Sequence, residues 1–209
     1  MDSYRILIEF TESNIYWIAP LFTILITLNV AYIFYAVGSL MSARHVVVRS
    51  VKLNQPVAVV WKAITDQESY PDWQRHVRGC LSQNEEWIET SLFGSTTFKI
   101  AEMTAEKLWV RQSTHINLKW WITLFLGSNA IESTTWTFEM YPSGDAAQEC
   151  ILHVSKDSHV GSPAFRLLWA LALGVGSDVE QYLNDLHRFV DPENTQFRIH
   201  KPIHGKLPF

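Results

Sequence analysis

The feature that most constrains this chain is a long run without a single charged residue or histidine. It extends over residues 15–43, "IYWIAPLFTILITLNVAYIFYAVGSLMSA". At about 1.5 Å of rise per residue, a helix of this length crosses a hydrocarbon core of roughly 30 Å with residues to spare. Tyr16 and Trp17 lie at one end and Tyr32 and Tyr35 toward the other, where aromatic side chains anchor helices at membrane surfaces. The run predicts a transmembrane helix.

Two other interpretations of this run remain open, a cleaved signal peptide and a buried core helix. A signal peptide has a shorter apolar region, a basic start and small residues just before the cleavage site. Here Met41 would occupy the third position before a cut after Ala43, and the lead over residues 1–14 is mainly acidic. These features favour a helix that stays in the membrane at residues 15–43.

Basic residues are distributed unequally around the run. Arg44, Arg49 and Lys52 follow it, whereas only Arg5 precedes it. Cytoplasmic flanks of membrane helices carry the excess of Lys and Arg. We therefore expect a single-pass membrane protein whose C-terminal domain lies on the cytoplasmic side.

The composition limits the classes of partner. A formal net charge of −4 gives no reason to expect nucleic acid. Nine tryptophans are many for 209 residues, and such a number lines a large core, a cavity or a membrane interface. Cys80 and Cys150 form no close motif, so we expect neither a disulfide framework nor a zinc site.

The residues after the run predict a strand and then short helical turns. Residues 45–54 are β-branched and partly alternating, as in a strand. The next segment places apolar residues at helical spacing, namely Val57, Val60, Trp61 and Ile64. The stretch "DQESYPDW" at 66–73 ends this helix, and its aromatic residues suggest that something apolar must be covered there.

The second half predicts a meander followed by a helix. Residues 75–158 contain six short strands separated by polar turns, which is typical of an antiparallel sheet. A helical stripe of about eight turns follows. Gly174 and Gly176 interrupt it, which indicates a kink or a close approach of a ligand or the sheet; a simple break before a second helix is the alternative. Residues 191–209 form a polar tail that we expect to be loosely held.

At this point the chain resembles a known family. The segment "VWKAITDQESYPDW" (60–73) is similar to a recurrent segment of the START-like, or SRPBCC, superfamily of polyketide cyclase/dehydrase and lipid-transfer domains. The matching residues are Trp61, Asp66, Tyr70, Pro71 and Trp73. The resemblance covers residues 46–190 and agrees with the order of the predicted elements.

The resemblance implies an α+β helix-grip fold. In it a curved antiparallel sheet of about seven strands surrounds a long C-terminal helix, and two short helices follow the first strand. The expected organisation is a lead (1–14), a transmembrane helix (15–43), a START-like domain (45–190) and a polar tail (191–209).

The resemblance also implies a function. Domains of this kind hold a hydrophobic small molecule or lipid in a cavity between sheet and helix, so we expect membrane-anchored binding, or transfer, of such a ligand. Tyr70 and Trp73 would cap the interior. Two alternatives are an enzyme of the cyclase, dehydratase or hydrolase type acting on an apolar substrate, and a protein-interaction module whose cavity has collapsed around tryptophans.

The candidate cavity residues come from strands, short helices and the long helix. They are Trp61, Tyr70, Trp73, Arg111, Trp136, Glu139, His153, Phe165, Trp169, Gly174 and Gly176. Four polar residues in strands would contact the ligand if they pointed inward, namely Arg111, Glu132, Glu139 and His153. Strand alternation also allows the solvent face for each of them, and His153 also fits a core histidine.

No catalytic motif is present. His200 and His204 have helical spacing for a metal, but Pro202 lies between them. No serine has the surroundings of a nucleophile elbow, and no glycine loop follows a strand to hold phosphate. We therefore expect no metal and no cofactor. The expected partners are a hydrophobic small molecule or lipid and the membrane.

The segment 117–129, "NLKWWITLFLGSN", is too apolar for an exposed loop and too short to span a bilayer. It is either a strand or lid packed on the core, or a tip that dips into the bilayer. In the second case Trp120, Trp121 and Phe125 would contact the membrane with Lys119 at headgroup level. In both cases the segment is expected to border the cavity entrance.

Overall fold

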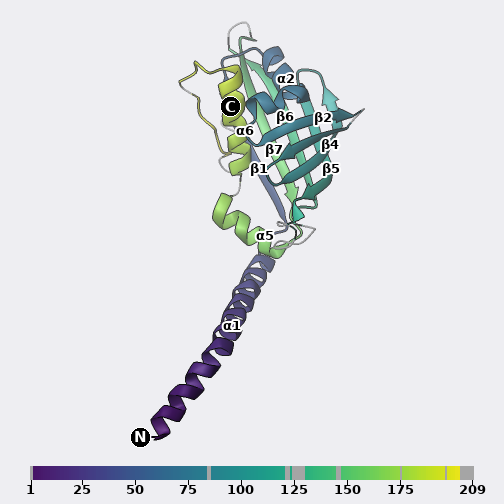
Figure 1. Ribbon diagram of the computed structural model, residues 1–209. Coiled ribbons are helices and arrows are strands. Elements are labelled where there is room, and N and C mark those ends of the chain that lie inside the picture. Colours follow the sequence, from purple (N-terminus) through teal and green to yellow (C-terminus); the bar gives the residue numbers. More distant parts are fainter. Residues whose placement is uncertain are drawn as a thin grey trace.

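The computed structural model describes residues 2–83, 86–120, 123, 130–144, 147–174, 176–195 and 197–202, with side chains of the first helix from Ile18 on. Figure 1 shows a long N-terminal helix that leads into one α+β domain. The helices are α1 (Asp2–Ser39), α2 (Val57–Thr65), the short turn η1 (Gln67–Ser69), α3 (Tyr70–Trp73), α5 (Pro163–Leu168), the π-type turn η3 (Trp169–Leu173) and α6 (Ser177–Val190). The strands are β1 (Arg44–Leu53), β2 (Val77–Gln83), β3 (Glu86–Ser91), β4 (Gly94–Thr104), β5 (Leu108–Leu118), β6 (Ser133–Ser143) and β7 (Glu149–His159).

Helix α1 contains residues 15–39 of the charge-free run. Its segment Ile18–Ser39 comprises 22 residues, is long and apolar enough to cross a membrane, and is only 6% buried within the protein. The helix projects away from the domain (Figure 1). Most of its side chains from Ile18 on are therefore not covered by the domain.

The end of α1 packs tightly on α5. A Cβ atom on Gly38 would lie 1.9 Å from the Pro163 carbonyl oxygen, so only glycine allows this approach. Arg166 of α5 donates from Nη1 to the Met41 carbonyl at 3.2 Å, from Nε to the Val160 carbonyl at 2.8 Å and from Nη2 to the Gly161 carbonyl at 3.0 Å. Arg166 thus fixes the junction between helix and domain.

The seven described strands form one antiparallel sheet in the order β1-β7-β6-β5-β4-β3-β2, which confirms the predicted meander. The register places several strand ends together. Arg44 pairs with His159, which pairs in turn with Ser133, and Gly94 pairs with Leu118. We call this the anchor-side end of the sheet, because β1 begins there directly after α1, the helix that the sequence predicts to be the anchor.

Helix α6 lies in the concave face of the sheet, as a helix-grip fold requires (Figure 1). Its stripe of Val179, Tyr182, Leu183 and Leu186 is buried against inward-facing residues of the strands. Alternation along the strands supplies the other half of the core, which consists of Val51, Trp87, Phe98, Trp109, Trp136, Phe138, Leu152 and Val154.

The eight-turn helix predicted for the C-terminal part is broken in the structure. Gly174 and Gly176 adopt φ values of +73° and +92°, which no right-handed helix contains. Nothing lies within 4 Å of a Cβ placed on Gly174, whereas one on Gly176 would lie 2.7 Å from Val47 Cγ1 and 2.9 Å from Arg49 Nη2. Gly174 therefore allows the backbone to turn, and Gly176 also allows α6 to begin in close contact with the sheet.

The described part of the C-terminal tail is docked, contrary to the expectation of a loose tail. Ser50 and His200 exchange two backbone hydrogen bonds of 3.0 and 2.8 Å at the open edge of β1. The Phe197 ring stacks on His187 with centroids 3.9 Å apart, and Lys201 Nζ lies 3.2 Å from Glu180 Oε1. The tail thus protects the edge of β1. His204 lies outside the described residues.

Candidate ligand site

The stretch at 66–73 belongs to the core. The Tyr70 hydroxyl donates to the Ile64 carbonyl at 2.6 Å. Trp73 packs edge-on against Tyr70 and Tyr182, with centroids 5.6 and 5.3 Å apart, and stacks on Phe189 at 5.9 Å. Helix α3 therefore covers the apolar interior beside α6. Trp61 lies half-buried on α2, packed against the same core.

Arg111 lies at the centre of the gripped interior and is only 2% exposed. Its Nη1 atom is 2.6 Å from Glu89 Oε1, which also accepts a 3.0 Å hydrogen bond from Trp87 Nε1. The Arg111 guanidinium carbon lies 4.7–5.8 Å from the centroids of six aromatic rings, those of Tyr70, Phe98, Trp109, Trp136, Phe138 and Tyr182. The centre of the domain is therefore an ion pair inside an aromatic cage.

The electrostatics keep the Arg111 guanidinium charged. Burial by itself would lower the pKa of the Arg111 guanidinium, but the neighbouring Glu89 carboxylate raises it above its ordinary value. Burial raises the pKa of both Tyr70 and Tyr182, so both phenols are neutral. Arg111 Nε, Trp109 Nε1 and the Tyr182 hydroxyl have no hydrogen-bond partner among the residues described here.

Aromatic side chains fill the space around this pair. The Trp109 ring lies 5.8 Å from Trp87 and 5.2 Å from Phe138, and Phe138 lies 6.0 Å from Trp136 and 5.4 Å from Tyr182. These are contact distances for aromatic rings. Tyr70, Trp73 and Trp136, three of the candidate cavity residues, are therefore packed in the core.

A recess opens at the anchor-side end, between β1 and β7 on one side and the α5–η3–α6 segment on the other. The recess is shallow: its closed part measures about 10 Å³, counted as space for the centre of a water-sized sphere, which is room for about one water molecule. Its lining residues are His45, Val47, Lys156, Ser158, Arg166, Trp169, Ala170, Gly176 and Asp178. Of the predicted cavity residues, Trp169 and Gly176 lie here, and Phe165 packs on Trp169 with ring centroids 5.5 Å apart.

The polar side of the recess contains Lys156, whose charge is balanced by an aspartate. Lys156 projects from the inner face of β7 and forms an ion pair with Asp178 in the first turn of α6. Its Nζ atom lies 5.0 Å from the Trp136 ring centroid and 5.2 Å from that of Trp169. Lys156 is thus held between two indole rings. The apolar side consists of Val47, Trp169 and Ala170.

A second ion pair holds α6 in place next to the recess. Arg49, on the inner face of β1, binds Glu180 with an Nε–Oε1 distance of 2.8 Å. Burial tends to raise the pKa of Glu180, but its hydrogen bonds to Arg49 and Lys201 lower it overall. Asp178 and Glu180 in the first turn also suit the helix dipole.

Of the four polar residues that were candidates to point inward, three lie away from the fourth, Arg111. Glu139 and His153 point to the outer face of the sheet, where Tyr141 donates to Glu139 at 3.1 Å and its ring lies 5.2 Å from His153. Glu132 pairs with His159 at 2.7 Å at the anchor-side end. The inward-facing set of Arg111, Glu139 and His153 that would have favoured an enzyme is therefore not assembled.

The remaining candidates lie outside the recess. Gly174 is exposed and does not line it. Trp120 is 77% exposed at the end of β5. Trp121 and Phe125, together with most of the segment 121–129, lie outside the described residues.

Sequence reasoning missed Glu89, Lys156 and Asp178. Alternation carried part of the signal, because Glu89 lies two residues after the buried Trp87 and Lys156 two residues after the buried Val154. Both charges should therefore have been placed inward. Their partners could not be found in this way, since pairing across distant elements depends on the tertiary fold.

Metal ligation is not indicated in the described ranges. No group of three or more His, Cys, Asp or Glu residues there is arranged to hold a metal ion. Cys80 and Cys150 are both free thiols.

Comparison with known proteins identifies the fold. No protein-family model and no curated protein matches the chain. A START superfamily protein from Mycobacterium smegmatis superposes with a TM-score of 0.53 at 16% identity, covering 71% of this chain and 98% of that one. A norcoclaurine synthase point mutant from Thalictrum flavum, in complex with a transition state analogue, has a TM-score of 0.54 at 11% identity, covering 75% and 99%.

A conserved protein from Geobacillus kaustophilus is similar to the same extent, with a TM-score of 0.54 at 10% identity, covering 74% of this chain and 99% of that one. At these identities the likeness concerns the fold alone. The neighbours include both a START superfamily protein and an enzyme. The α+β domain of this chain therefore has the helix-grip fold of the START superfamily.

Proposed function

We propose that residues 15–43 anchor the chain in a membrane and that the domain over 45–190 binds a hydrophobic small molecule or lipid, or transfers it. The ligand would bind in the recess between β1, β7 and the α5–η3–α6 segment. The basic residues after the anchor favour the cytoplasmic side for the domain.

The observation that carries the proposal is the composition of the recess. Val47, Trp169 and Ala170 form an apolar wall. Lys156 can donate a hydrogen bond to a ligand, and its ion-pair partner Asp178 can accept one. Ligand sites are typically apolar with a few polar groups that fix orientation. The ligand would place its apolar part on Trp169 and its polar group at Lys156.

The position of the recess supports delivery from a bilayer. It lies at the anchor-side end of the domain, and Arg166 both lines it and hydrogen-bonds the chain just after α1. A molecule that partitions into the bilayer would be concentrated next to this end of the domain. A domain tethered to the same bilayer meets it at high effective concentration.

Trp136 separates the recess from the caged ion pair. Its ring centroid lies 5.0 Å from Lys156 Nζ and 5.1 Å from the Arg111 guanidinium carbon. A ligand larger than a water molecule would have to widen the recess, and displacement of this ring would do so. Its far end would then reach the unpartnered Arg111 Nε and Tyr182 hydroxyl.

The second candidate function is a protein-interaction module. The packed aromatic centre of the domain favours it, because a filled grip leaves no large central cavity for a ligand. An enzyme remains an alternative on the fold alone, since a structural neighbour is a norcoclaurine synthase. The outward direction of Glu139 and His153 gives it no support from this chain's residues.

Lipid analysis of three purified forms of the full chain tests the proposal. Wild type, Trp169→Ala and Trp61→Ala are isolated from membranes in the same detergent, and the molecules that remain bound are extracted and quantified by mass spectrometry. All three share the anchor, so lipids bound to α1 cancel in the comparison. Trp61 is a matched control, because it is a half-buried tryptophan outside the recess.

We expect one or a few apolar species to be enriched on wild type and on Trp61→Ala. On Trp169→Ala their amount should fall by roughly tenfold, which corresponds to about 1.4 kcal/mol of lost binding energy. If all three proteins retain the same molecules in the same amounts, the recess binds no ligand and the interaction module becomes the better description.

A further inference from the structure

Exposed apolar side chains gather at the anchor-side end of the domain. They come from the chain after α1, the β3–β4 turn, the end of β5 and the α5–η3 segment, and they are Leu40, Leu92, Phe93, Trp120, Leu168 and Leu171. We call this set the anchor-side rim. Trp120 is 77% and Leu171 72% exposed, which is costly for large apolar side chains in water.

The strand register brings these separate segments together. Gly94, which follows Phe93, pairs with Leu118, and the Lys119 amide donates to the Phe93 carbonyl at 3.0 Å. The β3–β4 turn therefore lies beside Trp120. Helix α5, which carries Leu168, packs on the end of α1 at Gly38.

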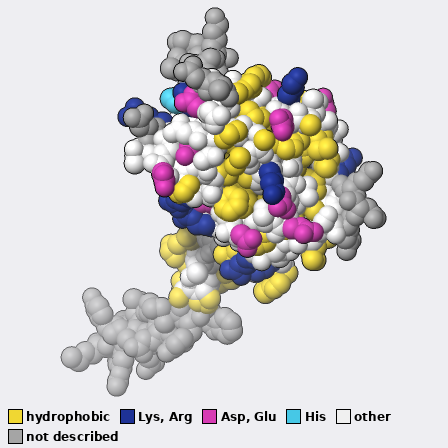
Figure 2. Space-filling view, turned by 90° about the horizontal axis from the view of Figure 1, so that it is seen from above, with side chains coloured by type: hydrophobic (Ala, Val, Ile, Leu, Met, Phe, Trp, Pro, Cys, Tyr) yellow, Lys and Arg dark blue, Asp and Glu magenta, His cyan; other side chains and the backbone are white. Residues whose placement is uncertain are grey.

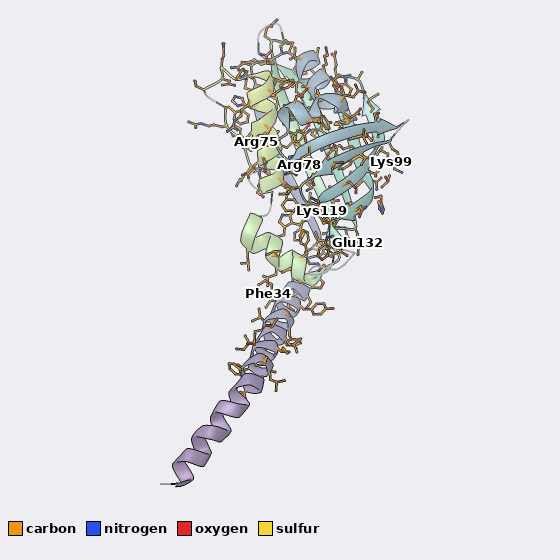
Figure 3. All side chains as sticks on the ribbon, in the orientation of Figure 1. Phe34, Arg75, Arg78, Lys99, Lys119 and Glu132 are labelled. Carbon is orange, nitrogen blue, oxygen red and sulfur yellow. The ribbon has the colours of Figure 1, made fainter. Side chains whose placement is uncertain are left out.

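Figure 3 shows Lys119 and Glu132 at the end of the sheet next to the top of α1, whereas Lys99 lies farther away. The rim thus faces the side from which the anchor leaves. A helix that enters a bilayer places the adjoining surface of its domain at the headgroup level, where apolar and aromatic side chains are stabilised and Lys can reach outward.

We propose that the anchor-side rim rests in the interface of the lipid bilayer, so that the domain lies on the membrane rather than hanging from a free tether. This inference rests on the proposed anchor but concerns a separate surface. Contact of the rim with the bilayer would fix the position of the recess, because Trp169 and Ala170, which line the recess, belong to the same η3 turn as the rim residue Leu171. Apolar insertion is the main contribution to this docking, since Arg44 at the same end is paired with Asp157 at 2.6 Å.

The opposite end of the molecule also exposes apolar side chains, but charged side chains lie between them. Figure 2, which views the molecule from above, shows acidic and basic side chains dispersed among the apolar ones. Met103 lies near the other end of β4 from Phe93, about 30 Å away at the rise of a β-strand. Both side chains are 56% exposed. Met103 is therefore a matched control for Phe93.

Depth-dependent quenching tests the inference on the full chain. Single cysteines replace Phe93, Leu171, Met103 or Ile26 in a Cys80→Ser background, and Cys150 stays because it is fully buried. Each is labelled with an environment-sensitive fluorophore in phosphatidylcholine vesicles that contain nitroxide-labelled lipids. Ile26 reports on the anchor, and a thermal unfolding midpoint close to wild type confirms each fold.

We expect strong quenching at Ile26, quenching at Phe93 and Leu171 from nitroxides near the headgroups, and several-fold weaker quenching at Met103. Quenching at Ile26 alone would overturn the inference while leaving the anchor intact. Quenching at none of the four positions would overturn the anchor itself and the rim with it. Equal quenching at Phe93 and Met103 would also overturn it, because the contact would not be confined to the rim.

Discussion

Replacement of Arg111 by Met is expected to lower the free energy of unfolding by about 3–5 kcal/mol, because it leaves the Glu89 carboxylate buried without its counter-ion. Arg111 is 2% exposed, and its partner is held at 2.6 Å within an aromatic cage. The measurement is urea unfolding of the full chain in detergent, followed by tryptophan fluorescence. Trp87 and Trp109 lie beside the pair and report on it.

The double replacement Arg111→Met with Glu89→Gln is the control for this prediction. It removes the buried charge and keeps an acceptor for Trp87 Nε1, so it should restore at least half of the lost stability. A single Arg111→Met protein within about 0.5 kcal/mol of wild type would contradict the buried pair, since changes of that size are typical of surface positions.

Trp73→Ala is expected to cost about 3–5 kcal/mol, the usual range for removing a large aromatic side chain from a core. Trp73 packs against Tyr70, Tyr182 and Phe189, so its loss opens a cavity between α3 and α6. The same urea titration measures it.

Trp120→Ala is the matched comparison for Trp73→Ala. Trp120 is also a tryptophan but is 77% exposed, so its replacement should change the unfolding free energy by no more than about 0.5 kcal/mol. Equal midpoints for Trp73→Ala and wild type would mean that α3 does not cover the core.

The sheet and the short helices were predictable because their signals are local. Alternation along β6 puts Trp136 and Phe138 on one face, and a period-2 pattern of this kind decides the face without knowledge of the partner. The burial of Tyr70 and Trp73 was indicated by their place in a polar turn, where aromatic side chains have no purpose, whereas helix α3 itself was implied by the family resemblance. The Ser162 hydroxyl caps α5 by accepting a hydrogen bond from Phe165 N at 3.4 Å.

The break in the C-terminal helix was visible but ambiguous. Gly174 and Gly176 mark it in the sequence, yet a glycine in a helical stripe fits a kink, a close contact or a break equally well. The decisive fact is the proximity of Gly176 to Val47 and Arg49, which are more than a hundred residues away in the chain. Such contacts depend on the tertiary fold.

The candidate site was predictable only in part, because its chemistry comes from pairs. Arg111 was a candidate cavity residue whose direction the sequence left open, and its neutralisation by Glu89 and the cage around it require the register of β3, β4 and β5. Lys156 and Asp178 meet across a sheet–helix contact that no local pattern encodes. The sequence also did not reveal that the centre of the domain is filled, because nine tryptophans are compatible with a lined cavity as well as with a packed core.

Photolabelling of the recess tests the central claim most directly. The full chain is placed in phosphatidylcholine vesicles that contain a fatty acid with a mid-chain diazirine, irradiated and digested, and the labelled residues are located by mass spectrometry. Label on α1 and on the rim is expected from bilayer contact alone. The account predicts additional label on the strand walls of the recess, at residues 45–47 and 156–158, and its reduction by Trp169→Ala. Label confined to α1 and the rim would contradict it, because the ligand would then never reach the recess.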